Sequence, residues 1–308
     1  MHSSLIVWLF NLVARLPLRV LHGIGAALSW LTYWLSSSYA KRLRENLANA
    51  YPDLSESDLR QMLNANIAET GKGGSELPWA WQRPLPEILR KVQNCHGLEH
   101  LEAAHQRGHG VIILTPHMGC FEIIGAYVAA RMPMTCMYRP PRQLWLDKII
   151  RGGRERGQMR LARTDIGGVR TLLKALKRGE AIGLLPDQVP GNGEGEWTEF
   201  FGRPAYTMTL VGRLMEASGA TVLLSHSVRL PRGAGYVIHI APLELSPGGV
   251  NSAQPKVGGG LPTFGVSVAR QINAALEQVI RTCPAQYLWS YNRYKKPAGT
   301  MPASREKT

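Results

Sequence analysis

Short apolar runs alternate with longer segments of helical periodicity along most of this 308-residue chain. The run GVIILT (110–115) has the length and composition of a strand buried on both faces, whereas FEIIGAYVAARM (121–132) has the length and spacing of a helix. Strands that alternate with helices of ten or more residues are typical of βαβ units. The pattern therefore predicts an α/β fold with a mixed, largely parallel central sheet flanked by helices. We expect the other strands at residues 134–140, 181–188, 220–230 and 235–245, the last two as a hairpin, and the other helices at residues 97–108, 143–157, 167–179, 209–218 and 264–284.

Glycine and proline mark the expected interruptions of this pattern. Residues 41–70 are helical in spacing, and the three prolines of LPWAWQRPLPE (77–87) are expected to end that helix and to expose Trp79 and Trp81. The basic helix further along is expected to break at Gly152–Gly153. A glycine-rich loop is expected after the PDQ sequence that begins at residue 186.

The N-terminus carries two apolar runs, and the second, residues 20–35, contains no Asp, Glu, Lys or Arg. Aromatic residues near its end and basic residues after it are typical of a membrane boundary on the cytoplasmic side. The region lacks the basic start and cleavage site of a signal peptide. Two alternatives remain, a single membrane span and a helical hairpin in the interface. The aromatic residues are Trp30, Tyr33 and Trp34, and the basic residues are Lys41, Arg42 and Arg44.

The sequence pattern predicts that the chain is divided into three parts. We expect an N-terminal membrane-anchoring segment at residues 1–40, a catalytic domain at 41–296 and a disordered tail at 297–308. Within the domain, SPGGVNSAQPKVGGGLPT (246–263) reads as a loop.

Composition limits the classes of partner. A hydrophobic content of 44% with 19% charge supplies a sizeable core and excludes a wholly disordered chain. The net charge of +14 favours nucleic acid, an anionic membrane or an acidic soluble partner. No basic motif interleaved with aromatic residues supports nucleic-acid binding. Four scattered cysteines form no zinc or disulfide pattern, which favours a reducing compartment.

The first candidate site lies in TPHMGCFEI (115–123), directly after a predicted strand. Open α/β sheets bind ligands beyond the carboxyl ends of their strands, so His117 is well placed for chemistry. Residues five apart on a regular helix point about 140° away from one another, so His117 and Glu122 can pair only if His117 lies in the turn before the helix. A carboxylate on one ring nitrogen leaves the other free as a base. The alternative is a helix-capping His and a Glu that complements the helix dipole.

Other polar groups follow the same pattern. Asp187 and Gln188 end another predicted strand, and FFGRPA offers Arg203 after the glycine-rich loop. RGGRERG (151–157) brings three arginines together, either as a phosphate clamp or as a solvated basic face. These three are Arg151, Arg154 and Arg156.

The segments PHMGCFEI, YRPP, RGGRERG, LLPDQ, FFGRPAYT and PAQYLWSYNRYKKP occur in an order that resembles the lipid A biosynthesis late acyltransferases, within the lysophospholipid acyltransferase superfamily. The resemblance covers nearly the whole chain. It implies an inner-membrane enzyme, with its catalytic domain on the cytoplasmic side, that moves a fatty acyl chain from an acyl carrier protein thioester to a hydroxyl of a phosphorylated glycolipid precursor of lipid A. One departure from the family pattern is WSYNRYK (289–295), where a basic or His residue is expected nearer the tryptophan.

The resemblance also implies roles for individual residues. The H-x4-D/E dyad of the family falls on His117 and Glu122, as base and orienting acid. The conserved arginine of the family falls most plausibly on Arg154, with Arg151 and Arg156 as the alternative registers. Asp187 and Gln188 match the PDQ element, and we expect them to contact substrate, as we expect of the candidate Arg203.

Elementary chemistry agrees with acyl transfer. An alcohol loses its proton as it attacks a thioester, and a neutral histidine can accept that proton. The oxyanion needs donors, which backbone N–H groups near a helix start or an arginine can supply. This chemistry requires no metal, cofactor or covalent nucleophile.

Several alternatives remain at this point. A nucleophilic Cys120 is a weaker reading, because this residue is expected to pack on the helix. An ester hydrolase built on Ser225–His226 or another serine is also weaker, because no G-x-S-x-G elbow is present. A non-catalytic basic membrane protein would keep its function without His117. A closer alternative is an acyltransferase of the same fold that acts on a glycerophospholipid or an aminolipid.

Overall fold

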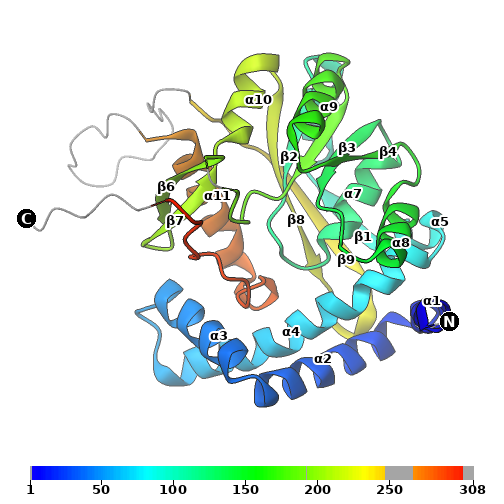
Figure 1. Ribbon diagram of the computed structural model, residues 1–308, viewed down its shortest axis with the longest axis vertical. Helices are drawn as coiled ribbons and strands as arrows, with labels where there is room; N and C mark the ends of the chain where they lie inside the picture. Colours follow the sequence, from blue (N-terminus) through cyan, green and yellow to red (C-terminus); the bar gives the residue numbers. More distant parts are fainter. Residues whose placement is uncertain (1, 192, 247–265, 301–308) are drawn as a thin grey trace, which may run out of the picture.

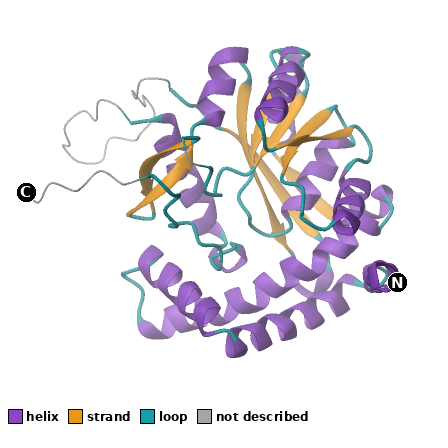
Figure 2. Cartoon of the chain, in the orientation of Figure 1, coloured by secondary structure: helices purple, strands orange, loops and turns teal. Residues whose placement is uncertain are grey.

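The computed structural model describes residues 2–191, 193–246 and 266–300 (Figure 1). A seven-stranded, mostly parallel sheet in the order β1-β9-β8-β2-β5-β3-β4 forms its centre, with helices around it (Figure 2). The predicted α/β architecture is confirmed. The strands are β1 (Val92–His96), β2 (Val111–Leu114), β3 (Met134–Tyr138), β4 (Met159–Arg163), β5 (Ala181–Leu184), β6 (Gly195–Phe200), β7 (Arg203–Met208), β8 (Thr221–Arg229) and β9 (Tyr236–Pro242).

From β1 onward helices alternate with most of these strands, and five helices of the described residues precede β1. They are α1 (His2–Ala14), α2 (Leu18–Leu35), α3 (Ser37–Ala50), α4 (Glu56–Gln82), α5 (Leu85–Leu89), α6 (Leu98–Gln106), α7 (Phe121–Ala129), α8 (Leu144–Arg154), α9 (Ile166–Lys177), α10 (Leu210–Ser218) and α11 (Val268–Thr282).

Strand β2 lies between β8 and β5 and pairs with both in parallel. All four of its residues are buried, as expected for a strand covered on both faces. Leu114 is in register with Leu184, so the carboxyl ends of β2 and β5 are level. It is also in register with Leu224 of β8, which continues beyond this point to Arg229. This alignment brings the loop after β2 and the loop after β5 to one edge of the sheet.

Apolar side chains fill both faces of the sheet. One core cluster joins the sheet to α9, α10 and α11, and the other joins it to α6 and α7. The N-terminal helices α2, α3 and α4 run together along one side of the sheet, and α4 contributes to both clusters (Figure 1).

Two expected helix breaks are wrong. Helix α4 continues through Pro78 to Gln82, and Trp79 and Trp81 are buried, at 4% and 8% exposure, rather than exposed. Burial of two tryptophans outweighs the backbone hydrogen bond that a proline removes. Helix α8 likewise continues through Gly152 and Gly153. Gly153 is required there, because a Cβ would lie 2.3 Å from the Cβ of Trp81.

The predicted glycine-rich loop after the PDQ sequence is also wrong in part. Residues expected to form a loop make the antiparallel ribbon β6–β7, with a tight turn at Phe201 and Gly202, both at positive φ. Strands β1 and β4 were not anticipated from the sequence. The hairpin β8–β9 is confirmed. The predicted loop at 246–263 falls almost wholly outside the described residues, as do residues 301–308 of the predicted tail.

The N-terminal apolar runs form two helices, α1 and α2, and α2 packs along α4. One face of α2 is buried on the protein and the other is exposed. No helix within the described ranges combines the length and apolar character needed to cross a bilayer. Whether residues 1–40 form a separate anchoring segment stays a prediction. The exposed apolar residues of α2 are Val20, Ile24, Leu28, Leu31, Trp34 and Leu35.

Candidate active site

His117 lies in a tight turn between β2 and α7. The turn begins where Thr115 N–H donates to the carbonyl of Leu184, at 3.0 Å, as a continuation of the β2–β5 ladder. It reverses at Gly119, which has φ +58°, and a Cβ there would lie 1.9 Å from the carbonyl oxygen of Ser227. Only glycine fits this close approach in a left-handed conformation. The strand end and the glycine together fix where His117 stands.

Asp187 and Gln188 hold the imidazole of His117. His117 Nδ1 lies 2.7 Å from Asp187 Oδ1, and His117 N–H donates to Asp187 Oδ2 at 2.8 Å. The other ring nitrogen, Nε2, lies 3.1 Å from the side-chain amide nitrogen of Gln188. An ionised Asp187 accepts from Nδ1–H, which leaves the lone pair on Nε2. Nε2 is therefore the basic atom of the site.

The Asp187 carboxylate is 2% exposed, while the His117 side chain is 14% exposed. Burial works against its ionisation, but the charge of His117 and the hydrogen bonds from it lower the pKa of Asp187 below its ordinary value. Asp187 is thus a buried anion that fixes the orientation of the imidazole. Its two oxygens face the histidine.

Glu122 has a different partner from the one expected. Its carboxylate accepts from the guanidinium of Arg154, with Arg154 Nε to Glu122 Oε2 at 2.9 Å. Among the described residues no hydrogen bond joins Glu122 to His117. Arg154 has a raised pKa; burial opposes the shift, and the charge of Glu122 beside it produces it. In place of the expected His117–Glu122 pair, the structure has a His117–Asp187 pair and a Glu122–Arg154 pair. A catalytic role for Glu122 stays a prediction.

The other candidate arginines lie in separate environments. Arg151 is exposed and pairs with Glu155 at 2.9 Å. Arg156 donates to backbone carbonyl groups around the end of α4, which makes it a structural residue. Arg203 lies on β7 with its guanidinium 4.0 Å from the ring centroid of Tyr294. Of the arginines singled out in the sequence, Arg154 is the one in contact with Glu122.

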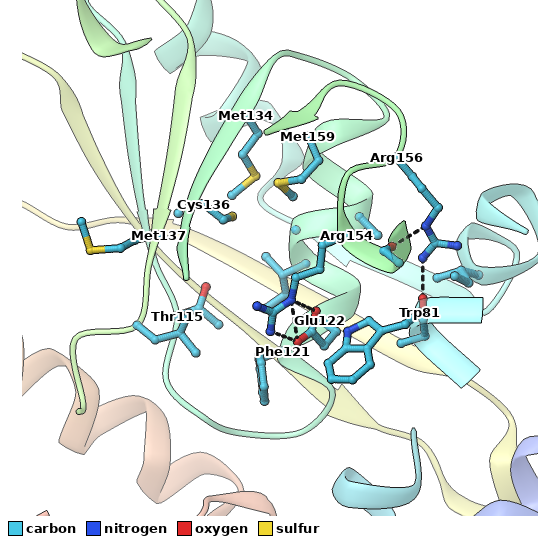
Figure 3. A pocket seen from close by; sticks show the side chains of 18 of the residues that line it. Trp81, Thr115, Phe121, Glu122, Met134, Cys136, Met137, Arg154, Arg156 and Met159 are labelled. Carbon is cyan, nitrogen blue, oxygen red and sulfur yellow. Dashed lines mark hydrogen bonds and ion pairs between the residues drawn. The ribbon is translucent and has the colours of Figure 1, made fainter. Parts of the chain in front are cut away.

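A small apolar cavity of about 80 Å³ lies beside these pairs (Figure 3). The Glu122–Arg154 pair lies in its wall, next to Trp81 and Phe121, and three methionines are also among its lining residues. Phe121 also packs edge-on against His117, with ring centroids 5.0 Å apart. Phe121 therefore connects the cavity with the basic nitrogen. The methionines are Met134, Met137 and Met159.

The alternative nucleophiles are in poor positions. Cys120 is 3% exposed, and burial raises the pKa of its thiol well above the ordinary value, so it stays protonated. Ser225 is fully buried, and on a strand it points to the opposite face from His226, whose ring stacks on His239. Among the described residues no cluster of His, Cys, Asp and Glu has the arrangement of a metal site.

Sequence reasoning identified His117 and Asp187 separately and missed that they form one unit. The sequence did contain a signal for this pairing, namely that both residues directly follow strands of a parallel sheet. The carboxyl ends of neighbouring parallel strands meet at one edge of such a sheet. What the sequence could not supply was the strand order that makes β2 and β5 neighbours.

Comparisons with known proteins agree with this geometry. The family model described as bacterial lipid A biosynthesis acyltransferase matches residues 1–296. The chain is 28% identical to the lipid A biosynthesis lauroyltransferase of Escherichia coli K12, over 96% of this chain and 90% of the relative. It is also 28% identical to the palmitoleoyltransferase of the same organism, with the same coverage, and 25% identical to a Haemophilus influenzae acyltransferase over 94% of this chain and 90% of the relative. The protein belongs to the bacterial lipid A biosynthesis acyltransferase family.

Proposed function

We propose that this protein transfers a fatty acyl chain from an acyl carrier protein thioester to a hydroxyl group of a phosphorylated lipid A precursor. The observation that carries the proposal is His117, whose Nδ1 is fixed by Asp187 at the edge of the sheet, beside an apolar cavity. Family membership supports the class of reaction and implies a glycolipid acceptor. The thioester donor and the residue roles are inferences from chemistry.

His117 acts as the general base. As the acceptor oxygen bonds to the thioester carbon, the hydroxyl proton moves to Nε2, and Asp187 stabilises the imidazolium that results. When the C–S bond breaks, the imidazolium returns the proton to the departing thiolate. The ester and the free thiol are the products, and no covalent enzyme intermediate forms.

The oxyanion requires donors other than the N–H groups of the turn. His117 N–H is used by Asp187, Met118 N–H donates to Pro116 at 2.8 Å, and Gly119 N–H donates to Gln286 at 3.1 Å. In the first turn of α7, Ile123 N–H donates to the carbonyl of Cys120 at 3.1 Å, whereas the N–H groups of Phe121 and Glu122 have no acceptor within the helix and no side-chain cap. We place the oxyanion at the start of α7, where the helix dipole also favours negative charge.

The apolar cavity is the place we assign to the acyl chain. Its lining is mostly apolar, and methionine side chains adapt to the shape of a flexible chain. The named relatives transfer different acyl groups, so their names do not assign a chain length to this protein. In the cavity wall, Glu122 and Arg154 neutralise one another, so neither leaves an unpaired charge beside the acyl chain.

The exposed face of α2 is the surface we assign to the membrane. Its apolar residues recur at three- and four-residue spacing from Val20 to Leu35, and the opposite face is buried on α4. Exposed basic residues lie before and after this stripe, at Arg15, Arg19 and Lys41. An amphipathic helix with basic flanks lies in the plane of an anionic interface. This arrangement fits the inner membrane with the catalytic domain on its cytoplasmic side, and the basic surface also suits an acidic carrier protein.

Membrane binding has a direct test with a matched control. Leu28→Glu with Leu31→Glu should abolish flotation with phosphatidylglycerol vesicles. Leu144→Glu with Ile166→Glu places the same two charges at exposed apolar residues of α8 and α9, 80% and 74% exposed, and should float as the wild type does. Equal flotation of all three proteins would remove α2 as the membrane surface.

Acyl transfer is tested with purified protein, a panel of acyl–acyl carrier proteins and a phosphorylated, tetra-acylated glucosamine disaccharide. Mass spectrometry should detect one added acyl chain, which His117→Ala eliminates and the exposed His109→Ala retains. Absence of product from every donor, with folded protein, would rule out the lipid A acceptor. Glycerophospholipids and aminolipids are then the acceptors to test, because they suit the closest alternative function.

A further inference from the structure

The apolar cavity beside His117 extends along the sheet, away from the edge where the histidine lies. At that edge its lining includes Thr115, which directly follows β2, and Phe121, the first residue of α7. Its lining also includes Met134 and Met159, the first residues of β3 and β4. Parallel strands end together at one edge of a sheet, so their first residues lie toward the opposite edge. The two methionines therefore lie at the end of the cavity that is remote from His117.

The register of the strands gives the length of this path. Met134 pairs with Ala181, and Leu184, three residues further along β5, is level with the end of β2. At about 3.3 Å per residue, the path from the edge to the level of Met134 is about 10 Å long. An extended acyl chain whose thioester carbon lies at the edge therefore points its methyl end toward the two methionines.

The two methionine side chains are packed together and backed by glycines. Met134 and Met159 are in register on neighbouring parallel strands, and their side chains lie side by side on the face of the sheet that packs on α7 (Figure 3). A Cβ at Gly125, on α7, would lie 3.0 Å from Met159 Cε, and a Cβ at Gly183, on β5, would lie 2.6 Å from Met134 Cε. Glycine at these two positions therefore leaves the room that the ends of the methionines occupy.

We propose that Met134 and Met159 are specificity-determining residues, which close the remote end of the cavity and set the longest acyl chain that it accepts. The proposal rests on the proposed acyl transfer, because it takes this cavity as the place of the acyl chain. A longer chain has to displace the methionine ends within a packed core or leave methylene groups in water. Because methionine has three rotatable bonds, the limit is graded rather than absolute.

Two substitutions should move the chain-length preference in opposite directions. Met159→Ala removes the side chain beyond Cβ and lengthens the path. For a donor two carbons longer than the best donor of the wild type, kcat/KM should rise roughly 10-fold relative to that best donor, the scale of two buried methylene groups. In Gly125→Ala the new Cβ pushes the end of Met159 into the cavity. The best donor of the wild type should then lose roughly 4-fold in kcat/KM relative to a donor two carbons shorter, the scale of one methylene group.

Met132→Ala is the matched control. Met132 is 3% exposed and belongs to the same core cluster as Met159, but it is not among the residues that line the cavity. The substitution removes the same atoms from the same core, so it should lower stability in a similar way. Its order of preference among acyl donors should equal that of the wild type. A general loosening of the core therefore cannot imitate a shift confined to Met159→Ala.

A second readout separates this proposal from the proposed function. Displacement of a fluorescent fatty acid by a series of saturated fatty acids, each two carbons longer than the last, requires neither a carrier protein nor a glycolipid. A longer best-bound acid in Met159→Ala and a shorter one in Gly125→Ala, with no change in Met132→Ala, support the proposal even if no acyl transfer is found. If free fatty acids do not bind, the donor preferences in acyl transfer decide.

The same chain-length preference in Met159→Ala, Gly125→Ala and the wild type would overturn the proposal. Absence of both fatty acid binding and acyl transfer in the folded wild type would reject it as well, together with the assignment of the cavity. If Met159→Ala does not fold, Gly125→Ala carries the test, because its expected shift toward shorter chains is independent of that variant.

Discussion

Two histidines of this molecule pair with carboxylates at the same distance, and we propose that one of the two pairs acts in catalysis. His22 Nε2 lies 2.7 Å from Glu76, and His117 Nδ1 lies 2.7 Å from Asp187. His22 is on the buried face of α2, and Glu76 is fully buried and also accepts from Arg229. The second nitrogen of His117 instead faces the exposed amide of Gln188.

The comparison shows that a histidine–carboxylate distance by itself does not identify a catalytic pair. In the Glu76 cluster every partner is inside the protein, so the charges stabilise the packing of α2 and α4 on the sheet. At His117 one nitrogen is fixed and the other is accessible, so the same pair can exchange a proton. Accessibility of the second nitrogen distinguishes the two roles.

The largest expected effect separates the two histidines directly. His117→Ala should reduce the rate of acyl transfer by roughly 10²–10⁴-fold, because it removes the base. His22→Ala should change the rate per folded molecule only a few-fold and lower the free energy of unfolding by about 1–3 kcal/mol. Initial rates of the two variants measure the loss of acyl transfer, and urea unfolding measures the loss of stability. Equal rate losses would contradict the distinction.

The next prediction distinguishes the two candidate acids. Asp187→Asn should lower the turnover number by roughly 10²–10⁴-fold, because an amide does not hold the Nδ1–H tautomer as a carboxylate does. Glu122→Gln should lower it less, through a weaker hold on Arg154. Steady-state kinetics of the two variants test the order. The reverse order would return the orienting role to Glu122, as the sequence first indicated.

A third prediction concerns the buried cluster. Glu76→Gln should lower the free energy of unfolding by about 3 kcal/mol, because it leaves the buried guanidinium of Arg229 with Glu69 as its remaining charge partner. Glu155→Gln removes a carboxylate from an exposed pair with Arg151 and should cost no more than about 1 kcal/mol. Urea unfolding of both variants is the measurement, and similar losses would contradict the contrast.

The last prediction concerns how the free energy of unfolding changes at acidic pH. Arg229 and His22 lower the pKa of Glu76 from 4.5 to about 2, against the effect of burial. Because the folded pKa is depressed, the stabilisation is complete above pH 4.5 and is lost as the pH falls toward 2, about 3 kcal/mol in total. Asp187, whose pKa is also lowered, adds a change of the same sign. As the pH falls across this range, the free energy of unfolding should decrease more steeply in the wild type than in Glu76→Gln.

Much of the fold could be predicted from the chain alone. Runs such as 111–114 are apolar throughout because a parallel strand is covered on both faces, and the helices between them keep a single apolar stripe. The predictions failed where tertiary contacts outweigh local preference. Pro78 lies inside α4, and glycines lie inside α8, because buried tryptophans hold those turns in place.

The sequence by itself determined that His117, Glu122, Asp187 and Arg154 lie after strands or on the helices that follow them. Only the tertiary structure decided which of them meet. Strand order places the loop after β5 beside the loop after β2, so Asp187 reaches the histidine ring and Glu122 turns to Arg154. Local spacing restricts which residues of one helix can touch, but pairing across strands depends on the whole sheet, which no short stretch of sequence encodes.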